Sequence, residues 1–223
     1  SNTGLTGIGV TCFVSDGGYL FAGTNETGMF RSGDNGLNWI SVNAGLTNLK
    51  IRALAIGNGF LFAATWGGGV FRSANQGSTW EAVNTGLFGT YIRSIAVSGS
   101  RLLAGTAGSG VYRSDDNGVN WTASNAGITS PSHIYAFAIK EGYVFAAQGG
   151  TIYRSTNNGT SWPASFSIFS SYSSVITMMA KGNDLYSSTT RACCDGSTGL
   201  FRSTNNGDSW GGDRMSTRLN SSH

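Results

Sequence analysis

The chain has 223 residues, of which 39% are hydrophobic and 11% are charged, with a formal net charge of +3. This length and apolar content suffice for one all-β domain or two smaller ones with a sizeable core, and they exclude a disordered or fibrous chain. The few lysines and arginines are not clustered as phosphate neutralisation requires, so we expect no nucleic-acid partner. No run of about 18 apolar residues is present to span a membrane.

The first residues show no basic stretch followed by an apolar one, so they do not predict a signal peptide, although a removed or missing leader stays open. The three cysteines are Cys12, Cys193 and Cys194, an odd number without the spacing of a zinc site. The adjacent pair could form a strained vicinal disulfide, but the geometric demands of that bond favour two free thiols. We therefore predict no metal site and no cofactor.

Five stretches of the chain align without a gap, and each predicts two antiparallel strands joined by a tight turn. They cover residues 10–24, 51–65, 92–106, 134–148 and 175–189. In the second stretch, residues 51–56 predict a buried strand, residues 57–59 a hairpin turn, and residues 60–64 the partner strand.

A third strand is predicted after each pair, where an apolar residue is followed by Phe or Tyr, then Arg, then Ser. These segments are 29–32, 70–73, 111–114, 152–155 and 200–203, each followed seven residues later by a tryptophan. A fourth strand is predicted at the tryptophan, over residues 80–84 in the second repeat. Four short strands in about 41 residues are typical of a propeller blade, and no segment shows helical periodicity.

The fold class predicted is therefore all-β, a β-propeller with five visible four-stranded antiparallel blades. The repeat units cover about 4–42, 43–83, 84–124, 125–165 and 166–210.

The turn between the third and fourth strands carries the pattern Ser-x-Asp/Asn-x-Gly-x-x-Trp in every repeat. The five sets in chain order are Ser32, Asp34, Gly36 and Trp39; Ser73, Asn75, Gly77 and Trp80; Ser114, Asp116, Gly118 and Trp121; Ser155, Asn157, Gly159 and Trp162; and Ser203, Asn205, Gly207 and Trp210. The pattern resembles the Asp-box, or BNR repeat, of sialidase-like propellers, a superfamily that includes photosystem assembly factors. We expect the Asp or Asn oxygen to accept backbone N–H groups, the glycine to take a positive φ, and the tryptophan to cover the hairpin.

Three of the five turns have Asn where the other two have Asp. The turn therefore needs an acceptor oxygen, which both side chains supply, and not a negative charge. This weakens a calcium-site interpretation of residues 114–118, because hard cations favour several carboxylates. We predict that the turn is structural.

The two ends of the repeat predict an open ring within residues 1–210. Residues 1–5 match the stretch that follows a fourth strand elsewhere, and the repeat stops just after Trp210, where a fourth strand should begin. Because exposed sheet edges are unfavourable, we expect a fragment of a six- or seven-bladed ring, with a closed five-bladed ring as the alternative. Residues 211–223 are expected to be a non-native or disordered tail.

Five arginines occupy one position next to this turn: Arg31, Arg72, Arg113, Arg154 and Arg202. They could form a ring of cations for carboxylates or acidic proteins. Their identical placement favours the alternative that each stem packs on the tryptophan of its blade while the guanidinium bonds turn carbonyls.

Arg52 and Arg93 break the repeat, because their equivalents are Thr11, Tyr135 and Ile176. The first strand of a blade lines the central channel, so Arg52, Arg93 and Tyr135 are expected together near a channel mouth, where propellers commonly bind ligands. The alternative interpretation, which has equal weight, is that these residues are chance variation of a surface.

Two loops supply further candidates. The fifth repeat has an insertion over residues 190–199, and Arg191 within it is a candidate binding residue, because insertions map to loops and loops carry function. Trp66 lies in the equivalent turn of the second repeat, where an exposed ring would stack on a sugar or a partner and a packed ring would be core.

No catalytic pattern is recognisable. Sialidases use an arginine triad, a Tyr/Glu pair and an acid/base Asp, and Asp-box xyloglucanases use two carboxylates across a cleft between two propellers. His133 has no evident nucleophile beside it in the sequence. The carboxylates outside the turns match neither context: Asp16, Glu26, Glu81, Glu141, Asp184 and Asp195.

These observations favour a non-catalytic propeller scaffold that presents a rigid face to a protein or carbohydrate ligand. The resemblance further implies a monomer from a secreted or surface bacterial protein, in an extracellular or periplasmic location. The alternative is a fragment of a sialidase-like or xyloglucanase-like glycoside hydrolase.

Overall fold

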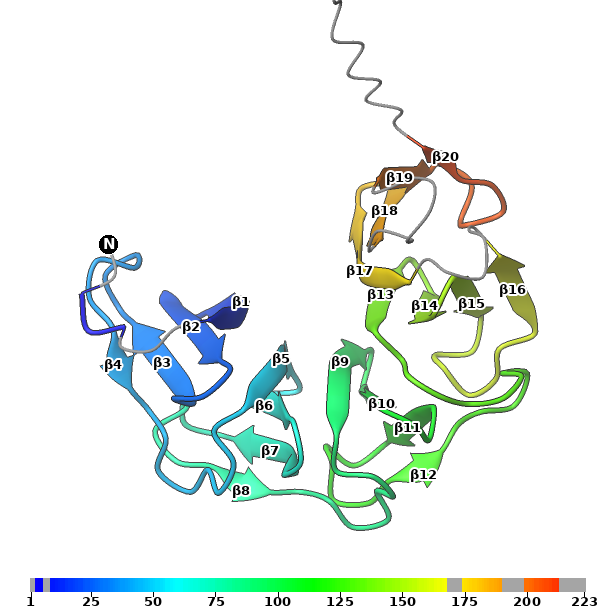
Figure 1. Cartoon of the computed structure of the whole chain (residues 1–223). Helices are drawn as coiled ribbons and strands as arrows, with labels where there is room; N and C mark the ends of the chain where they lie inside the picture. Colours follow the sequence, from blue (N-terminus) through cyan, green and yellow to red (C-terminus); the bar gives the residue numbers. More distant parts are fainter. Residues whose placement is uncertain (1–2, 6–8, 168–173, 190–198, 213–223) are drawn as a thin grey trace, which may run out of the picture.

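The computed structural model of the chain describes residues 3–5, 9–167, 174–189 and 199–212. Within these residues the chain forms five four-stranded antiparallel sheets and no helix. Each sheet is one blade, and the blades are set around a common axis with the first strand of each nearest the centre (Figure 1). The predicted β-propeller with five four-stranded antiparallel blades is therefore confirmed.

The strands follow one another through each sheet in chain order. The first two blades consist of β1 (Val10–Asp16), β2 (Tyr19–Thr24), β3 (Met29–Ser32), β4 (Ile40–Ser41), and β5 (Ile51–Gly57), β6 (Phe60–Thr65), β7 (Gly69–Ser73), β8 (Glu81–Ala82). The third and fourth consist of β9 (Ile92–Ser98), β10 (Arg101–Thr106), β11 (Val111–Ser114), β12 (Thr122–Ala123), and β13 (Ala136–Lys140), β14 (Tyr143–Gln148), β15 (Thr151–Ser155), β16 (Ala164–Ser167). The fifth consists of β17 (Val175–Lys181), β18 (Asp184–Thr189), β19 (Leu200–Ser203) and β20 (Gly211–Gly212).

The hydrophobic core lies between neighbouring blades, because both faces of each sheet carry apolar side chains. Phe62 and Val70 of the second blade, both fully buried, belong to one cluster with Leu102 and Trp121 of the third. The approach is close at Gly23, where an added Cβ would lie 2.5 Å from the Cγ2 atom of Ile51. A small residue at this place lets the next blade pack against the sheet.

The turn after each third strand has the same hydrogen bonds in all five blades. In the first, Gly36 donates its N–H to Ser32 Oγ at 2.9 Å, and Ser32 Oγ donates to Asp34 Oδ1 at 2.7 Å. In the other four turns the glycine N–H donates to the serine Oγ at 2.8 to 2.9 Å: Gly77 to Ser73, Gly118 to Ser114, Gly159 to Ser155 and Gly207 to Ser203. The five glycines have φ between 77° and 92°, so the expected positive φ is confirmed.

The Asp or Asn of each turn accepts a backbone N–H from the far side of the turn. Asp34 Oδ1 accepts that of Asn38 at 2.8 Å. The equivalent bonds of 2.8 to 2.9 Å are those of Asn75 with Thr79, Asp116 with Asn120, Asn157 with Ser161 and Asn205 with Ser209. Aspartate and asparagine therefore accept the same backbone hydrogen bond at this position, as expected of a turn that needs an acceptor and not a charge.

One feature of the turn was not predicted from the sequence. The residue before the glycine is also left-handed, with φ between 54° and 58°, although it is never glycine. It is asparagine in four blades and Gln76 in the other, and asparagine is the side chain that tolerates this conformation best. Two consecutive left-handed residues reverse the chain tightly between the third and fourth strands.

The tryptophans cover the turns, and four of them are buried: Trp39, Trp80, Trp121 and Trp162. Three of these join two blades, because the indole N–H donates to a carbonyl of the preceding blade at 2.8 to 2.9 Å: Trp80 to Val42, Trp121 to Val83 and Trp162 to Ser124. Trp39 and Trp210 instead donate within their own turns, to Gly36 O at 3.2 Å and Gly207 O at 3.1 Å. The inner tryptophans thus both close a turn and connect blades.

The prediction that no fourth strand follows Trp210 was wrong. Gly211 and Gly212 form β20, which pairs with Arg202 and Phe201 of β19. The physical reason is that a fourth strand needs only two residues, as β4, β8 and β12 also show. Residues 213–223 of the predicted tail lie outside the described residues.

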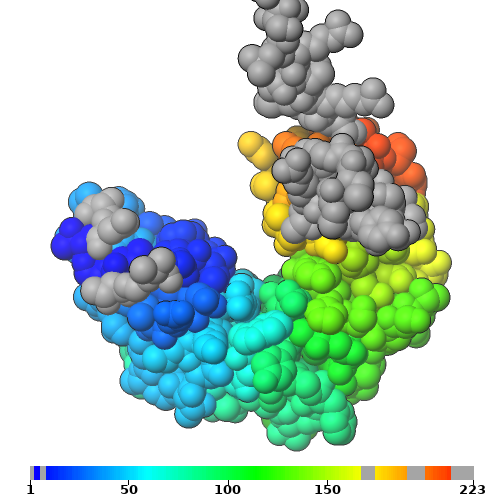
Figure 2. Space-filling model, in the orientation of Figure 1, coloured from blue at the N-terminus to red at the C-terminus, as the bar shows by residue number. Residues whose placement is uncertain are grey.

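The match between the start of the chain and a blade-to-blade connection is confirmed for residues 3–5. Thr3 O accepts the backbone N–H of Trp39 at 2.9 Å, just as Ala44 O accepts that of Trp80 at 2.8 Å. The described residues of the first and last blades lie apart across the open side of an arc (Figure 2). The blade number of a complete ring stays a prediction.

The turn carboxylates predict part of the acid sensitivity of the fold. Backbone and side-chain N–H bonds from Asn38 lower the pKa of Asp34 to about 2, and bonds from Asn120 lower the pKa of Asp116. A lowered pKa contributes stability above the ordinary value near 4 that is lost as the pH falls toward 2. The variant with both Asp34→Asn and Asp116→Asn should therefore lose less stability between about pH 4 and 2 than the parent chain.

Urea unfolding across this pH range, followed by far-UV circular dichroism, measures the effect. Asp16→Asn is the control, because it removes a carboxylate that lies outside the turns. A double variant with the same acid sensitivity as the parent chain and the control would contradict the prediction.

Candidate ligand-binding site

The repeated arginines join each blade to the next. Arg31 Nη1 donates to Gln76 O at 2.9 Å, Arg72 Nη1 to Asn117 O at 2.9 Å, and Arg154 Nη1 to Asn206 O at 2.8 Å. In each of these bonds the acceptor is the left-handed residue before the turn glycine of the following blade. The preferred alternative from the sequence is therefore correct for these three arginines, whose guanidinium groups bond turn carbonyls, whereas Arg113 Nη1 donates to Thr160 Oγ1 at 3.2 Å.

The same alternative was wrong about the packing partner. The guanidinium carbon of Arg31 lies 4.9 Å from the ring centre of Tyr19, and that of Arg72 lies 4.6 Å from the ring centre of Phe60. These rings stand at the start of the second strand. The tryptophan cannot serve as the partner, because it is buried beneath the turn. A ring of free cations on this face is thus excluded for Arg31, Arg72 and Arg154.

A second set of arginines does come together with aromatic rings, near the start of the inner strands. The guanidinium carbons of Arg52 and Arg93 lie 5.2 Å and 4.9 Å from the ring centre of Trp66. Arg93 also lies 4.9 Å from the ring centre of Tyr135. Arg52, Trp66, Arg93 and Tyr135 therefore form one arginine–aromatic cluster across the second, third and fourth blades.

The repeat explains how three blades supply this cluster. Arg52 and Arg93 are the second residues of β5 and β9, and Tyr135 precedes β13 at the equivalent position. Trp66 follows β6 and is fixed by its backbone N–H, which donates to Lys50 O at 2.8 Å. Because the inner strands lie side by side around the axis, equivalent positions on them become neighbours (Figure 1). The structure thus brings Arg52, Arg93 and Tyr135 together, whereas their role in binding stays a prediction.

The two arginines of the cluster have hydrogen-bond donors that are not paired within the described residues. The Nε atoms of Arg52 and Arg93 are both buried, and neither has a hydrogen-bond partner among the described residues. Each guanidinium lies within cation–π distance of the Trp66 ring, a contact worth about 0.5 to 2 kcal/mol. The N–H group at each Nε is left without the acceptor that a buried donor needs.

Further aromatic rings extend the cluster. The ring of Tyr91 meets Trp66 edge-on at 5.1 Å, and the ring of His133 stacks on Tyr135 at 6.0 Å with an interplanar angle of 20°. Tyr91 is 50% exposed, so apolar surface borders the cluster. The sequence predicted neither Tyr91 nor His133 as a site residue, although both directly precede the apolar start of a repeat stretch.

Trp66 fits neither of its two predicted roles. Trp66 is half-buried and lies within cation–π distance of both Arg52 and Arg93, so it is neither exposed at a loop tip nor packed into the core. The candidate residue Arg191 lies outside the described residues, as do Cys193, Cys194 and Asp195. Cys12 is a free cysteine, and burial raises the pKa of its thiol.

Most described carboxylates are held by other groups. Glu81, Asp115, Asp184 and Asp208 form ion pairs of 2.6 to 2.7 Å with Arg72, Arg101, Arg202 and Arg154. The carboxylates of Asp34 and Asp116 accept hydrogen bonds within their turns. Among the residues that the structure describes, no group of three or more His, Cys, Asp or Glu side chains is arranged to hold a metal ion.

Comparisons with solved structures place the chain among β-propellers. An ancestral GH74 enzyme is 19% identical with a TM-score of 0.73, and the match covers 92% of this chain and 31% of that enzyme. YCF48 bound to D1 peptide is 14% identical with a TM-score of 0.64, over 91% of this chain and 68% of that one. An extracellular domain of a putative one-component system from B. thetaiotaomicron is 17% identical with a TM-score of 0.68, over 91% and 27%.

At these identities the likeness shows the fold alone. The chain spans about a third of the length of the GH74 enzymes that it resembles. No protein-family model matches the chain, and no curated protein sequence matches it. Across the described part of the chain, the structure contains no helix of the length and hydrophobicity needed to span a membrane.

The stacking geometry predicts the effect of removing Trp66. Trp66→Ala loses two cation–π contacts and one edge-on aromatic contact, so we expect the free energy of unfolding to fall by about 1 to 3 kcal/mol. Trp66→Phe keeps a ring and should lose less than half as much. Urea unfolding followed by circular dichroism measures both, and equal losses for the two variants would contradict the stacking role.

Proposed function

We propose that this chain is a non-catalytic binding propeller that holds a carboxylate group of a protein or carbohydrate ligand on its arginine–aromatic cluster. The observation that supports the proposal is the pair of buried, unpartnered Nε atoms of Arg52 and Arg93 within the described residues. The proposal requires the two side chains to turn so that these buried donors reach a ligand carboxylate, which would supply the acceptor that they lack.

The orientation of the two side chains suits this chemistry. A guanidinium that stacks by its face keeps its N–H edge free, and that edge matches the two oxygens of a carboxylate. Both guanidinium carbons lie near one tryptophan ring, at 5.2 Å and 4.9 Å from its centre, so contact with Trp66 restrains both side chains. Hydrogen bonds to charged groups are worth about 1.5 to 3 kcal/mol each, so a carboxylate bound by both would be firmly oriented.

The half-exposed ring of Tyr91, which contacts Trp66, suggests a second feature of the ligand. A sugar ring or an apolar side chain beside the carboxylate would stack on it. The structure of YCF48 with the D1 peptide supports a peptide ligand, since it is a propeller with a bound polypeptide. As part of the same proposal, the repeated turn is of the Asp-box type, and the protein is a secreted bacterial monomer outside the cytoplasm.

The second candidate function is a fragment of a glycoside hydrolase, which the GH74 neighbours favour. Such an enzyme needs one carboxyl group with a raised pKa as the general acid and a second as base or nucleophile. Several described carboxylates do not suit these roles. Asp34 and Asp116 have lowered pKa values, and Glu81 and Asp115 are paired with arginines. Among the described carboxylates, this leaves Asp16, Glu26 and Glu141 without such a partner.

Binding to arrays of acidic peptides and of uronic or sialic acid glycans tests the leading proposal. Arg52→Ala and Arg93→Ala should each weaken a bound ligand about 10-fold or more, because each removes a charge-assisted hydrogen bond. Lys181→Ala is the control, since it removes one exposed positive charge on the fifth blade, away from the cluster. If all three variants bind equally well, the cluster is not the site.

Hydrolysis of xyloglucan and of sialylated glycans tests the second candidate. We expect no turnover above that of a heat-denatured sample. Turnover that is lost in Asp16→Asn, Glu26→Gln or Glu141→Gln, and kept in Arg52→Ala, would favour the hydrolase over the binding propeller.

A further inference from the structure

One position changes from fully buried to exposed at the last blade. The first residue of the shared third-strand pattern is 0% exposed in four blades, as Met29, Val70, Val111 and Ile152, because the next blade covers it. Its equivalent in the fifth blade, Leu200, is 53% exposed. The outward face of the fifth blade therefore has the composition of a blade–blade contact but no blade against it.

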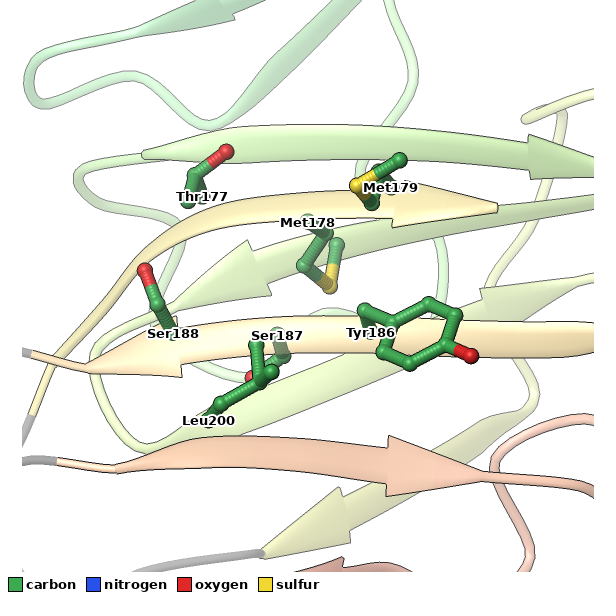
Figure 3. A pocket seen from close by; sticks show the side chains of 7 residues that line it. All are labelled: Thr177, Met178, Met179, Tyr186, Ser187, Ser188 and Leu200. Carbon is green, nitrogen blue, oxygen red and sulfur yellow. The ribbon is translucent and has the colours of Figure 1, made fainter. Parts of the chain in front are cut away.

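The rest of that face follows the same pattern. Met179, Tyr186, Ser188 and Leu200 line a shallow pocket over β17, β18 and β19 (Figure 3). Tyr186 is equivalent to the buried Phe21, Phe62, Leu103 and Phe145 of the other blades. Ser188 keeps the small residue that Gly23 supplies where Ile51 of the next blade approaches. Met179 is 54% exposed.

Arg202 lacks the one contact that its equivalents make. In the second blade, Arg72 uses Nε and Nη2 for Glu81 of its own blade, and Nη1 for the turn carbonyl of the next. Arg202 likewise uses Nε and Nη2 for Asp184. Its Nη1 has no partner among the described residues, and its side chain is 57% exposed against 15% for Arg72.

The outward face of the first blade carries the positions that contact a preceding blade elsewhere in the repeat. Phe13 is 60% exposed, whereas its equivalents Leu54 and Ile95 are buried against the preceding blade. Asn35, with φ of 58°, is the left-handed turn residue whose equivalents accept a hydrogen bond from the preceding arginine. Asn35 O has no such partner within the described residues.

We propose that the outward faces of the first and fifth blades are docking surfaces for further blades of this same repeat. A blade on the fifth face would offer a left-handed turn carbonyl to Arg202 Nη1 and cover Leu200 with its tryptophan and first-strand residues. A blade on the first face would offer its third-strand arginine to Asn35 O and cover Phe13. The occupant follows from continuity, because three of the four existing blade–blade contacts use the same arginine and turn carbonyl, and in the remaining one Arg101 donates to the equivalent carbonyl.

The test inserts a second copy of residues 42–82, one complete repeat in the right phase, directly after Gly212 of the full chain. Docking of this blade would bury Met179, so its oxidation by peroxide should slow by about 10-fold or more, because oxidation follows exposure. Amide exchange of β18 and β19 should slow as well. An insert with the same residues in scrambled order is the control.

Arg202→Ala in the extended chain removes the proposed hydrogen bond to the added blade but keeps the added residues. It should therefore restore part of the oxidation rate of Met179. Arg202→Lys, which keeps a donor but not the forked geometry, should be intermediate. Unchanged oxidation of Met179 in the extended chain overturns the proposal. Protection of Met179 in the original chain that rises with protein concentration also overturns it, because a second copy would then be the occupant.

Discussion

One repeated hydrogen bond joins three of the four pairs of neighbouring blades, from the arginine next to last in a third strand to a turn carbonyl of the following blade. Its acceptor is the left-handed residue before the turn glycine: Gln76, Asn117 or Asn206. Its donor is held by stacking on a ring of its own blade, so little freedom is lost when the bond forms. The third and fourth blades are joined at the equivalent carbonyl by a different residue. Arg101 stands where the other blades have the stacking ring, and it donates to Asn158 O at 3.1 Å.

The same regularity creates the candidate site. Equivalent residues of neighbouring inner strands lie side by side, so departures from the repeat in the second, third and fourth blades meet in space. Arg52 and Arg93 are held by Trp66, and their Nε atoms lack acceptors among the described residues. The repeated arginines thus join blades, and the two irregular ones are the residues on which the proposed binding site rests.

The fold itself does not choose between binding and hydrolysis, because propellers with this blade include GH74 enzymes as well as YCF48. Binding and hydrolysis instead require different side chains that have no partner within the fold. Most described carboxylates are occupied by arginines or by turn amides, whereas the unpartnered donors of the cluster are guanidinium groups. This distribution favours recognition of an anion over acid–base chemistry on a glycosidic bond.

The sequence by itself determined the blade, because strand alternation, turn glycines and the tryptophan spacing are local or strictly periodic signals. It also identified Arg52, Arg93, Tyr135 and Trp66 as departures from the repeat. Only the tertiary structure decided that Arg31 and Arg72 reach the next blade, that Gly211 and Gly212 suffice for a strand, and that Trp66 contacts two guanidinium groups. The arginine bonds join residues 45 positions apart, and the Trp66 contacts depend on side-chain direction, so no local pattern encodes either.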